Sequence, residues 1–233
     1  MKRLNHILIV LFLLTSIISC EKNKKNNEET LKKETISAKW SVTGISDYES
    51  FEFNKSGNYI VVKNTTTKST SNQIVLFGTY EIIDSKTISL SDFGTIKISN
   101  LDENTIIFTI TLDSNPNNGI SINAAKQDKI TSSTKTELLC RTWELVSFGG
   151  TETNSHFVLF SDAGTYFFQS ISRNGIGTWK WCDSEENKIA FTVSHELNCD
   201  GIETIINIVL TNDSFTGIDL ENGEPYEMIM NPK

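Results

Sequence analysis

Residues 51–59 read FEFNKSGNY, and residues 158–166 read VLFSDAGTY. The last seven residues of each segment follow one pattern: a phenylalanine, three polar or small residues, a glycine, a polar residue and a tyrosine. Glycine adopts positive φ values at little cost, so each segment predicts two antiparallel strands joined by a tight turn. The same pattern occurs twice in one chain, which indicates an internal duplication.

Three further motifs recur in the same order around these two hairpins. Trp40-Ser41-Val42 matches Trp143-Glu144-Leu145, Gly78-Thr79-Tyr80-Glu81-Ile82 matches Gly177-Thr178-Trp179-Lys180-Trp181, and Ile88-Ser89-Leu90 matches Ile189-Ala190-Phe191. Four matches in the same register indicate that one domain is present in two copies.

Alternation of apolar and polar residues dominates both copies. Residues 105–112 read TIIFTITL, and Ile206, Ile208 and Leu210 are predicted to share one face of a later strand. Each copy contains about eight such runs separated by turn residues, and none shows a sustained helical period. We therefore predict an all-β protein with two tandem, small, antiparallel up-and-down barrels. Barrel closure leaves no unpaired strand edge.

The N-terminus has the pattern of an export signal. Lys2 and Arg3 precede an apolar run from Ile7 to Ile18, which is too short for a permanent membrane span. The run ends in Ile-Ile-Ser-Cys20, which resembles the lipobox of bacterial lipoproteins. The resemblance implies cleavage before Cys20 and a membrane anchor through lipid on its thiol. The alternative is an ordinary secretory signal with an incidental cysteine.

The chain thus divides into five predicted parts. These are a lipoprotein signal peptide (1–19), a lipidated Cys20 with a flexible tether (20–37), a first barrel (38–127), a linker (128–137) and a second barrel (138–233). By resemblance to Gram-negative lipoproteins, Glu21 after the cysteine implies the outer membrane, with the protein facing either the periplasm or the cell surface.

The duplicated motifs resemble the lipocalin-like domains of Gram-negative lipoproteins. The matching features are the tryptophan near the first strand (Trp40, Trp143), the F-x-x-x-G-x-Y hairpin and the Gly-Thr-aromatic strand. The copies are shorter than full lipocalins and lack the Gly-x-Trp of that family. The resemblance implies membrane-anchored binding domains without catalytic activity.

Composition and motifs restrict the possible functions. The 233 residues include 21 basic and 29 acidic side chains, and the acidic balance argues against nucleic-acid binding. His156 and His195 have no partner at a metal-ligand spacing, and no nucleophile motif is present. We expect no metal, no cofactor and no catalytic residue. The enzymatic alternative is a hydrolase or isomerase that uses carboxylates at a barrel mouth.

Aromatic residues at alternating positions predict what fills each barrel. The inward candidates are Phe51, Phe53, Tyr59 and Tyr80 in the first copy and Phe160, Tyr166, Phe168, Trp179 and Trp181 in the second. An eight-stranded barrel can be solid or can hold one small ligand. A small apolar ligand would contact Trp179, Trp181, Tyr166 and Phe168. With solid cores, the protein would instead be a structural lipoprotein that binds another envelope protein.

Three further cysteines, Cys140, Cys182 and Cys199, would meet an oxidising environment after export, which predicts one disulfide. Proximity in sequence favours Cys182–Cys199. Strand parity favours Cys140–Cys182 instead, because a regular meander places Cys199 at the other end of the barrel. Both pairings stay open, with a preference for Cys140–Cys182.

Overall fold

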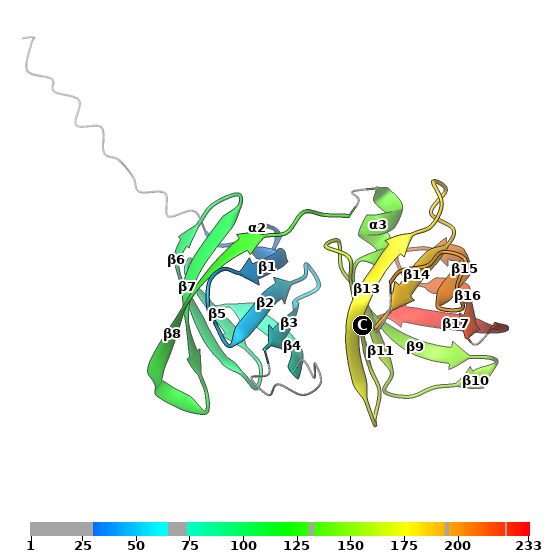
Figure 1. Cartoon of the computed structure of the whole chain (residues 1–233). Coiled ribbons are helices and arrows are strands. Elements are labelled where there is room, and N and C mark those ends of the chain that lie inside the picture. The colour runs from blue at the N-terminus through cyan, green and yellow to red at the C-terminus, as the bar shows by residue number, and fades with distance from the viewer. Residues whose placement is uncertain (1–29, 65–73, 131–132, 194–195, 222) are drawn as a thin grey trace, which may run out of the picture. The chain divides into compact units, whose positions relative to one another are not determined.

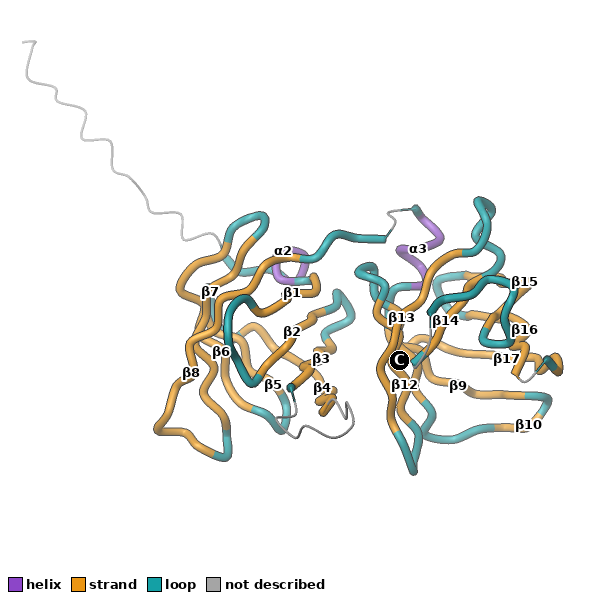
Figure 2. The backbone as a smooth tube through the Cα atoms, in the orientation of Figure 1, coloured by secondary structure: helices purple, strands orange, loops and turns teal. Residues whose placement is uncertain are grey.

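The computed structural model describes residues 30–64, 74–130, 133–193, 196–221 and 223–233. The predicted signal peptide, Cys20 and the first part of the tether lie outside these ranges. Residues 31–233 form one compact unit. Figures 1 and 2 show its strands and two short helices. Nowhere in the described ranges does a helix have the length and apolar character needed to cross a bilayer.

The first copy is a closed antiparallel barrel in which each strand pairs with the next and β1 pairs with β8. Its strands are β1 (Ala38–Val42), β2 (Tyr48–Phe53), β3 (Asn58–Lys63), β4 (Ile74–Ile82), β5 (Thr87–Leu90), β6 (Gly94–Leu101), β7 (Thr105–Leu112) and β8 (Asn115–Lys126). Figure 1 shows these strands in blue to green. The predicted up-and-down barrel is confirmed for this copy.

The second copy repeats this topology and closes through pairing of β9 with β17. Its strands are β9 (Thr142–Phe148), β10 (Thr151–Glu152), β11 (Phe157–Phe160), β12 (Thr165–Gln169), β13 (Asn174–Trp181), β14 (Ile189–Thr192), β15 (Thr204–Leu210), β16 (Phe215–Glu221) and β17 (Glu224–Pro232). The two-residue β10 pairs antiparallel with the last two residues of β9 and with no other strand of the sheet. The remaining eight strands form the second predicted barrel.

A short helix precedes each barrel. These helices are α2 (Lys33–Ile36) and α3 (Thr134–Leu139). The Trp40 indole donates to the Ile36 carbonyl oxygen at 3.0 Å, and Trp143 donates to that of Leu139 at 2.8 Å. Both tryptophans are fully buried. Residues 31–37, which the sequence assigned to the tether, therefore belong partly to the folded barrel, as the burial of Ile36 also shows.

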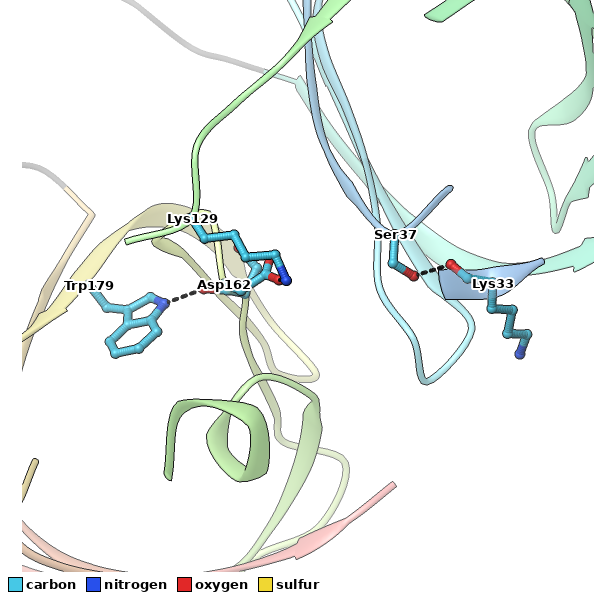
Figure 3. A network of polar contacts seen from close by, with 6 residues as sticks. Lys33, Ser37, Lys129, Asp162 and Trp179 are labelled. Atoms are coloured by element: carbon cyan, nitrogen blue, oxygen red, sulfur yellow. Dashed lines mark hydrogen bonds and ion pairs between the residues drawn. The ribbon is translucent and has the colours of Figure 1, made fainter. Parts of the chain in front are cut away.

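The hairpins that revealed the duplication have matching hydrogen bonds. Gly57 and Gly164 have φ values of +93° and +80°, which explains the glycine in both turns. The Tyr80 hydroxyl donates to the Asn54 carbonyl oxygen at 2.8 Å. The Trp179 indole donates to the Ser161 carbonyl oxygen at 2.9 Å, and Figure 3 shows Trp179 with this bond. An aromatic side chain thus anchors the same turn in each copy.

Apolar side chains of the described residues pack together in the interior of the first barrel. Phe51 and Phe108 meet edge to face with their ring centroids 5.0 Å apart, and both are buried. The Tyr59 hydroxyl donates to the Ser91 carbonyl at 2.7 Å, so this polar group needs no ligand. Phe93 stacks on the Tyr59 ring at 6.2 Å.

The predicted alternation holds for Ile208 and Leu210, but Ile206 does not share their face. The register of β15 against β16 shifts between Ile206 and Val209, where Asn207 has a φ of +55°. This bulge adds a residue to one strand and reverses the facing of those that follow. Ile205 and Ile208 are consequently the buried pair. The corresponding strand β6 also has a register shift against its next neighbour.

Outward-facing side chains of both barrels form a third, smaller apolar cluster, separate from the two barrel cores. Its buried members are Ile60, Val62, Leu159 and Phe167. The rings of Phe77 and Phe167 stack with centroids 4.8 Å apart. The Thr142 hydroxyl donates to the Asn58 side-chain oxygen at 2.8 Å. The two barrels therefore share an apolar interface within the compact unit.

Candidate ligand-binding site

A pocket of about 530 Å³ lies at one end of the second barrel. Its lining residues are Leu145, Phe148, Thr153, His156, Tyr166, Phe168, Arg173, Phe191, Val193, Ile202, Glu203 and Asp219. They come from β9, β12, β14 and β16 and from the loops that follow β10, β12 and β14. In an antiparallel meander these positions meet at one end of the barrel, and α3 lies at the other.

Three aromatic rings form a continuous wall of the pocket. The Tyr166 ring centroid lies 4.8 Å from that of Phe191 and 6.2 Å from that of Phe168. Phe168 pairs with Gly175 on the next strand, and a Cβ atom at that glycine would meet the Phe168 ring at 2.4 Å. Gly175 therefore leaves room for the Phe168 ring to lie across the neighbouring strand.

Charged side chains complete the lining. The carboxylates of Glu203 and Asp219 and the guanidinium of Arg173 belong to it. The Arg173 guanidinium carbon lies 5.4 Å from the Phe168 ring centroid. Burial raises the pKa of Tyr166, and the negative charges of Asp219 and Glu203 raise it further. The Tyr166 hydroxyl therefore stays protonated at neutral pH.

The lining also contains the imidazole of His156 and the hydroxyl of Thr153. The buried Nδ1 atom of His156 has no hydrogen-bond partner among the described residues. Nearby, the Thr153 hydroxyl donates to the Leu145 carbonyl oxygen. A ligand that enters the pocket could therefore meet a ring nitrogen whose hydrogen-bonding capacity is unused.

The structure separates the four residues that the sequence proposed for ligand contact. Tyr166 and Phe168 line the pocket. Trp179 is buried at the end near α3, and the Trp181 indole donates to the Thr136 hydroxyl of α3 at 2.8 Å. Their inward direction follows the alternation, but both lie at the opposite end of the barrel. The alternation along a strand predicts whether a side chain points into the barrel or out of it. The position of that side chain along the barrel axis depends on how the strands pair.

The disulfide joins Cys182 to Cys199, with their Cα atoms 5.5 Å apart, so the preferred Cys140–Cys182 pairing is wrong. The parity argument assumed that Cys199 stays at the end where its loop begins. Strand β14 has only four residues and spans roughly 13 Å. The number of residues between β14 and Cys199 is sufficient to cover that distance, so Cys199 can reach Cys182.

Cys140 keeps a free thiol. It follows α3, where its backbone N–H donates to the Thr136 carbonyl oxygen at 2.9 Å. Burial raises its pKa well above the usual thiol range, and the carboxylates of Asp162 and Glu52 raise it further. The thiolate is the reactive form of cysteine, so this group is a poor nucleophile at neutral pH.

Sequence reasoning missed the charged residues of the pocket, although one signal was available. Phe215, Gly217 and Asp219 alternate along β16, and the first two are buried. The same alternation places the Asp219 carboxylate on the inner face of the barrel. An acidic residue at an inward position is the pattern that could have identified it. Glu203 lies in a loop, where an acidic residue is unremarkable.

Within the part of the chain that the structure describes, no group of three or more His, Cys, Asp and Glu side chains is arranged to hold a metal ion. His195 lies outside that part. No known protein family matches the sequence, and no curated protein is significantly similar to it.

Proposed function

We propose that this protein is a membrane-anchored lipoprotein with lipocalin-like domains and that its second barrel binds a small ligand with an apolar body. The pocket in that barrel carries the proposal. Its volume of about 530 Å³ lies within the range of about 300–1,000 Å³ of small-molecule sites. Aromatic walls with a few polar groups are also typical of such sites.

Binding can be tested with the neutral fluorescent probe N-phenyl-1-naphthylamine. Its emission should rise to a saturable maximum as it is titrated against the full chain carrying Cys20→Ser, which avoids lipid and detergent. Phe168→Ala should weaken binding about tenfold, because it removes one face of the aromatic wall. Phe157→Ala is the matched control, because Phe157 is the neighbour of the inward-facing Val158 on β11 and therefore faces outward. Unsaturable emission, or equal effects of both variants, would contradict the proposal.

The proposed anchor is lipid on Cys20, with the protein in the outer membrane. The lipobox-like Ile-Ile-Ser-Cys and the polar segment after it support this location. Labelled palmitate should be incorporated into the wild-type chain and not into Cys20→Ser, and membrane fractionation should place the labelled protein in the outer membrane. Labelling that persists in the variant would exclude this anchor.

A structural role is a second candidate for the first barrel. Phe51, Phe108 and Tyr59 are buried in its core, and none of its residues lines the pocket of the second barrel. A filled barrel can act through its outer face, which would bind another envelope protein. Replacement of pocket residues should then impair ligand binding and leave this partner interaction unchanged.

A further inference from the structure

The pocket of the second barrel has two carboxylates at positions where the first barrel has none. Ile205 of β15 pairs with Asp219, and in the first copy Ile96 pairs with Ile110. Since Ile189 pairs with Ile205 as Ile88 pairs with Ile96, Asp219 occupies the place of the fully buried Ile110. The duplicated fold therefore does not require a carboxylate there.

Glu203 departs from the first copy in the same way. The backbone N–H of Phe191 donates to the Glu203 carbonyl at 3.1 Å, and the equivalent Leu90 pairs with Gly94. A buried glycine of the first barrel thus corresponds to an acidic residue of the second. Both acidic side chains line the same pocket. The second barrel therefore has two acidic side chains at its pocket where the first barrel has an isoleucine and a glycine.

Aromatic rings lie beside these carboxylates. Tyr166, Phe168 and Phe191 form the wall described above, and the carboxylates of Asp219 and Glu203 act on the Tyr166 hydroxyl. Ring faces attract organic cations through their quadrupoles, and carboxylates add a direct charge interaction. This combination suits an ammonium group next to an apolar body.

Arg173 and His156 are the other titratable groups of the lining. The Arg173 guanidinium is exposed and already lies over the Phe168 ring at 5.4 Å. It offsets one of the two negative charges, so the lining keeps a net negative charge when His156 is neutral. The ring contact also shows that this wall accommodates a cation.

We propose that the second barrel selects ligands in which an apolar body carries a cationic amine, with Glu203 and Asp219 next to the amine and the aromatic wall around the apolar part. This inference rests on the proposed ligand-binding function and specifies the class of ligand. It predicts a preference that depends on charge and weakens as salt concentration rises.

The test is displacement of N-phenyl-1-naphthylamine by 4-phenylbutylamine, 4-phenylbutanol and 4-phenylbutyrate, which differ in the head group. At pH 7 and low salt, the amine should compete at about a tenfold lower concentration than the alcohol, and the carboxylate should compete least. Glu203→Gln with Asp219→Asn should remove the preference for the amine and keep probe binding. Glu144→Gln is the matched control, because Glu144 lies next to the buried Trp143 on β9 and faces outward.

The outcomes separate this inference from the proposed function. If the probe does not bind to the folded chain, the proposed function fails. If the probe binds but the amine competes no better than the alcohol, the pocket stands and the cationic preference is refuted. A preference for the carboxylate would also refute it and would assign head-group recognition to Arg173. Circular dichroism of each variant confirms that the barrels remain folded.

Discussion

Glu52 is a buried carboxylate at the surface that the two barrels share. It is 4% exposed, and its Oε1 atom has no hydrogen-bond partner among the described residues. Burial raises its pKa, although Lys39 and the hydroxyls of Ser161 and Thr165 offset part of this effect. The charged form of Glu52 therefore costs stability in the folded protein.

The sign of the resulting pH dependence follows from proton binding. With its pKa higher in the folded state, Glu52 holds its proton to a higher pH there, so this contribution to stability is present at low pH and is lost as pH rises through the folded pKa. Glu52→Gln should raise the free energy of unfolding at pH 8 by about 1–3 kcal/mol and flatten its decline between pH 4.5 and 8. Urea unfolding across this range measures both effects. Glu81→Gln, at an exposed site on β4, should change neither.

At the level of elements, the disulfide ties the end of β13 to the loop that carries Ile202 and Glu203 of the pocket. Cys199→Ser should lower the free energy of unfolding by about 3 kcal/mol, because the bond closes a segment with a sequence separation of 17. It should also weaken binding of N-phenyl-1-naphthylamine, since the loop loses its attachment. Cys140→Ser should leave probe binding unchanged. Equal probe affinity in all three proteins would show that the loop position is independent of the disulfide.

The sequence predicted elements well where a local pattern decides them. Gly57 and Gly164 revealed both turns, and the tryptophans marked the start of each barrel. The position of Cys199 was missed, because a long loop carries no signal of where it returns. The bulge at Asn207 was missed for a similar reason, since no side-chain pattern distinguishes it from a regular strand position. The position of Cys199 and the bulge at Asn207 both depend on how strands pair with one another, which the local sequence does not show.

At the scale of the whole molecule, the two barrels share one topology and differ in their inward-facing side chains. Both barrels keep the helix, the buried tryptophan and the anchored hairpin turn. They differ at inward positions, where Ile110 of the first corresponds to Asp219 of the second. Because strand pairing and turns determine the barrel topology, inward-facing residues can differ while the topology stays the same. One duplicated sequence pattern is therefore compatible with an isoleucine at an inward position of the first barrel and a pocket-lining carboxylate at the same position of the second.

The apolar interface should make the two barrels energetically dependent on each other. The rings of Phe77 and Phe167 stack across it, so their contributions to stability should not add. In a double-mutant cycle, Phe77→Ala and Phe167→Ala should show a coupling of about 0.5–1.5 kcal/mol in the free energy of unfolding. Phe93→Ala with Phe168→Ala, which place one change in each barrel away from this cluster, should be additive. A coupling of zero for the first pair would mean that the barrels unfold independently, because a shared interface requires each ring to stabilise the other.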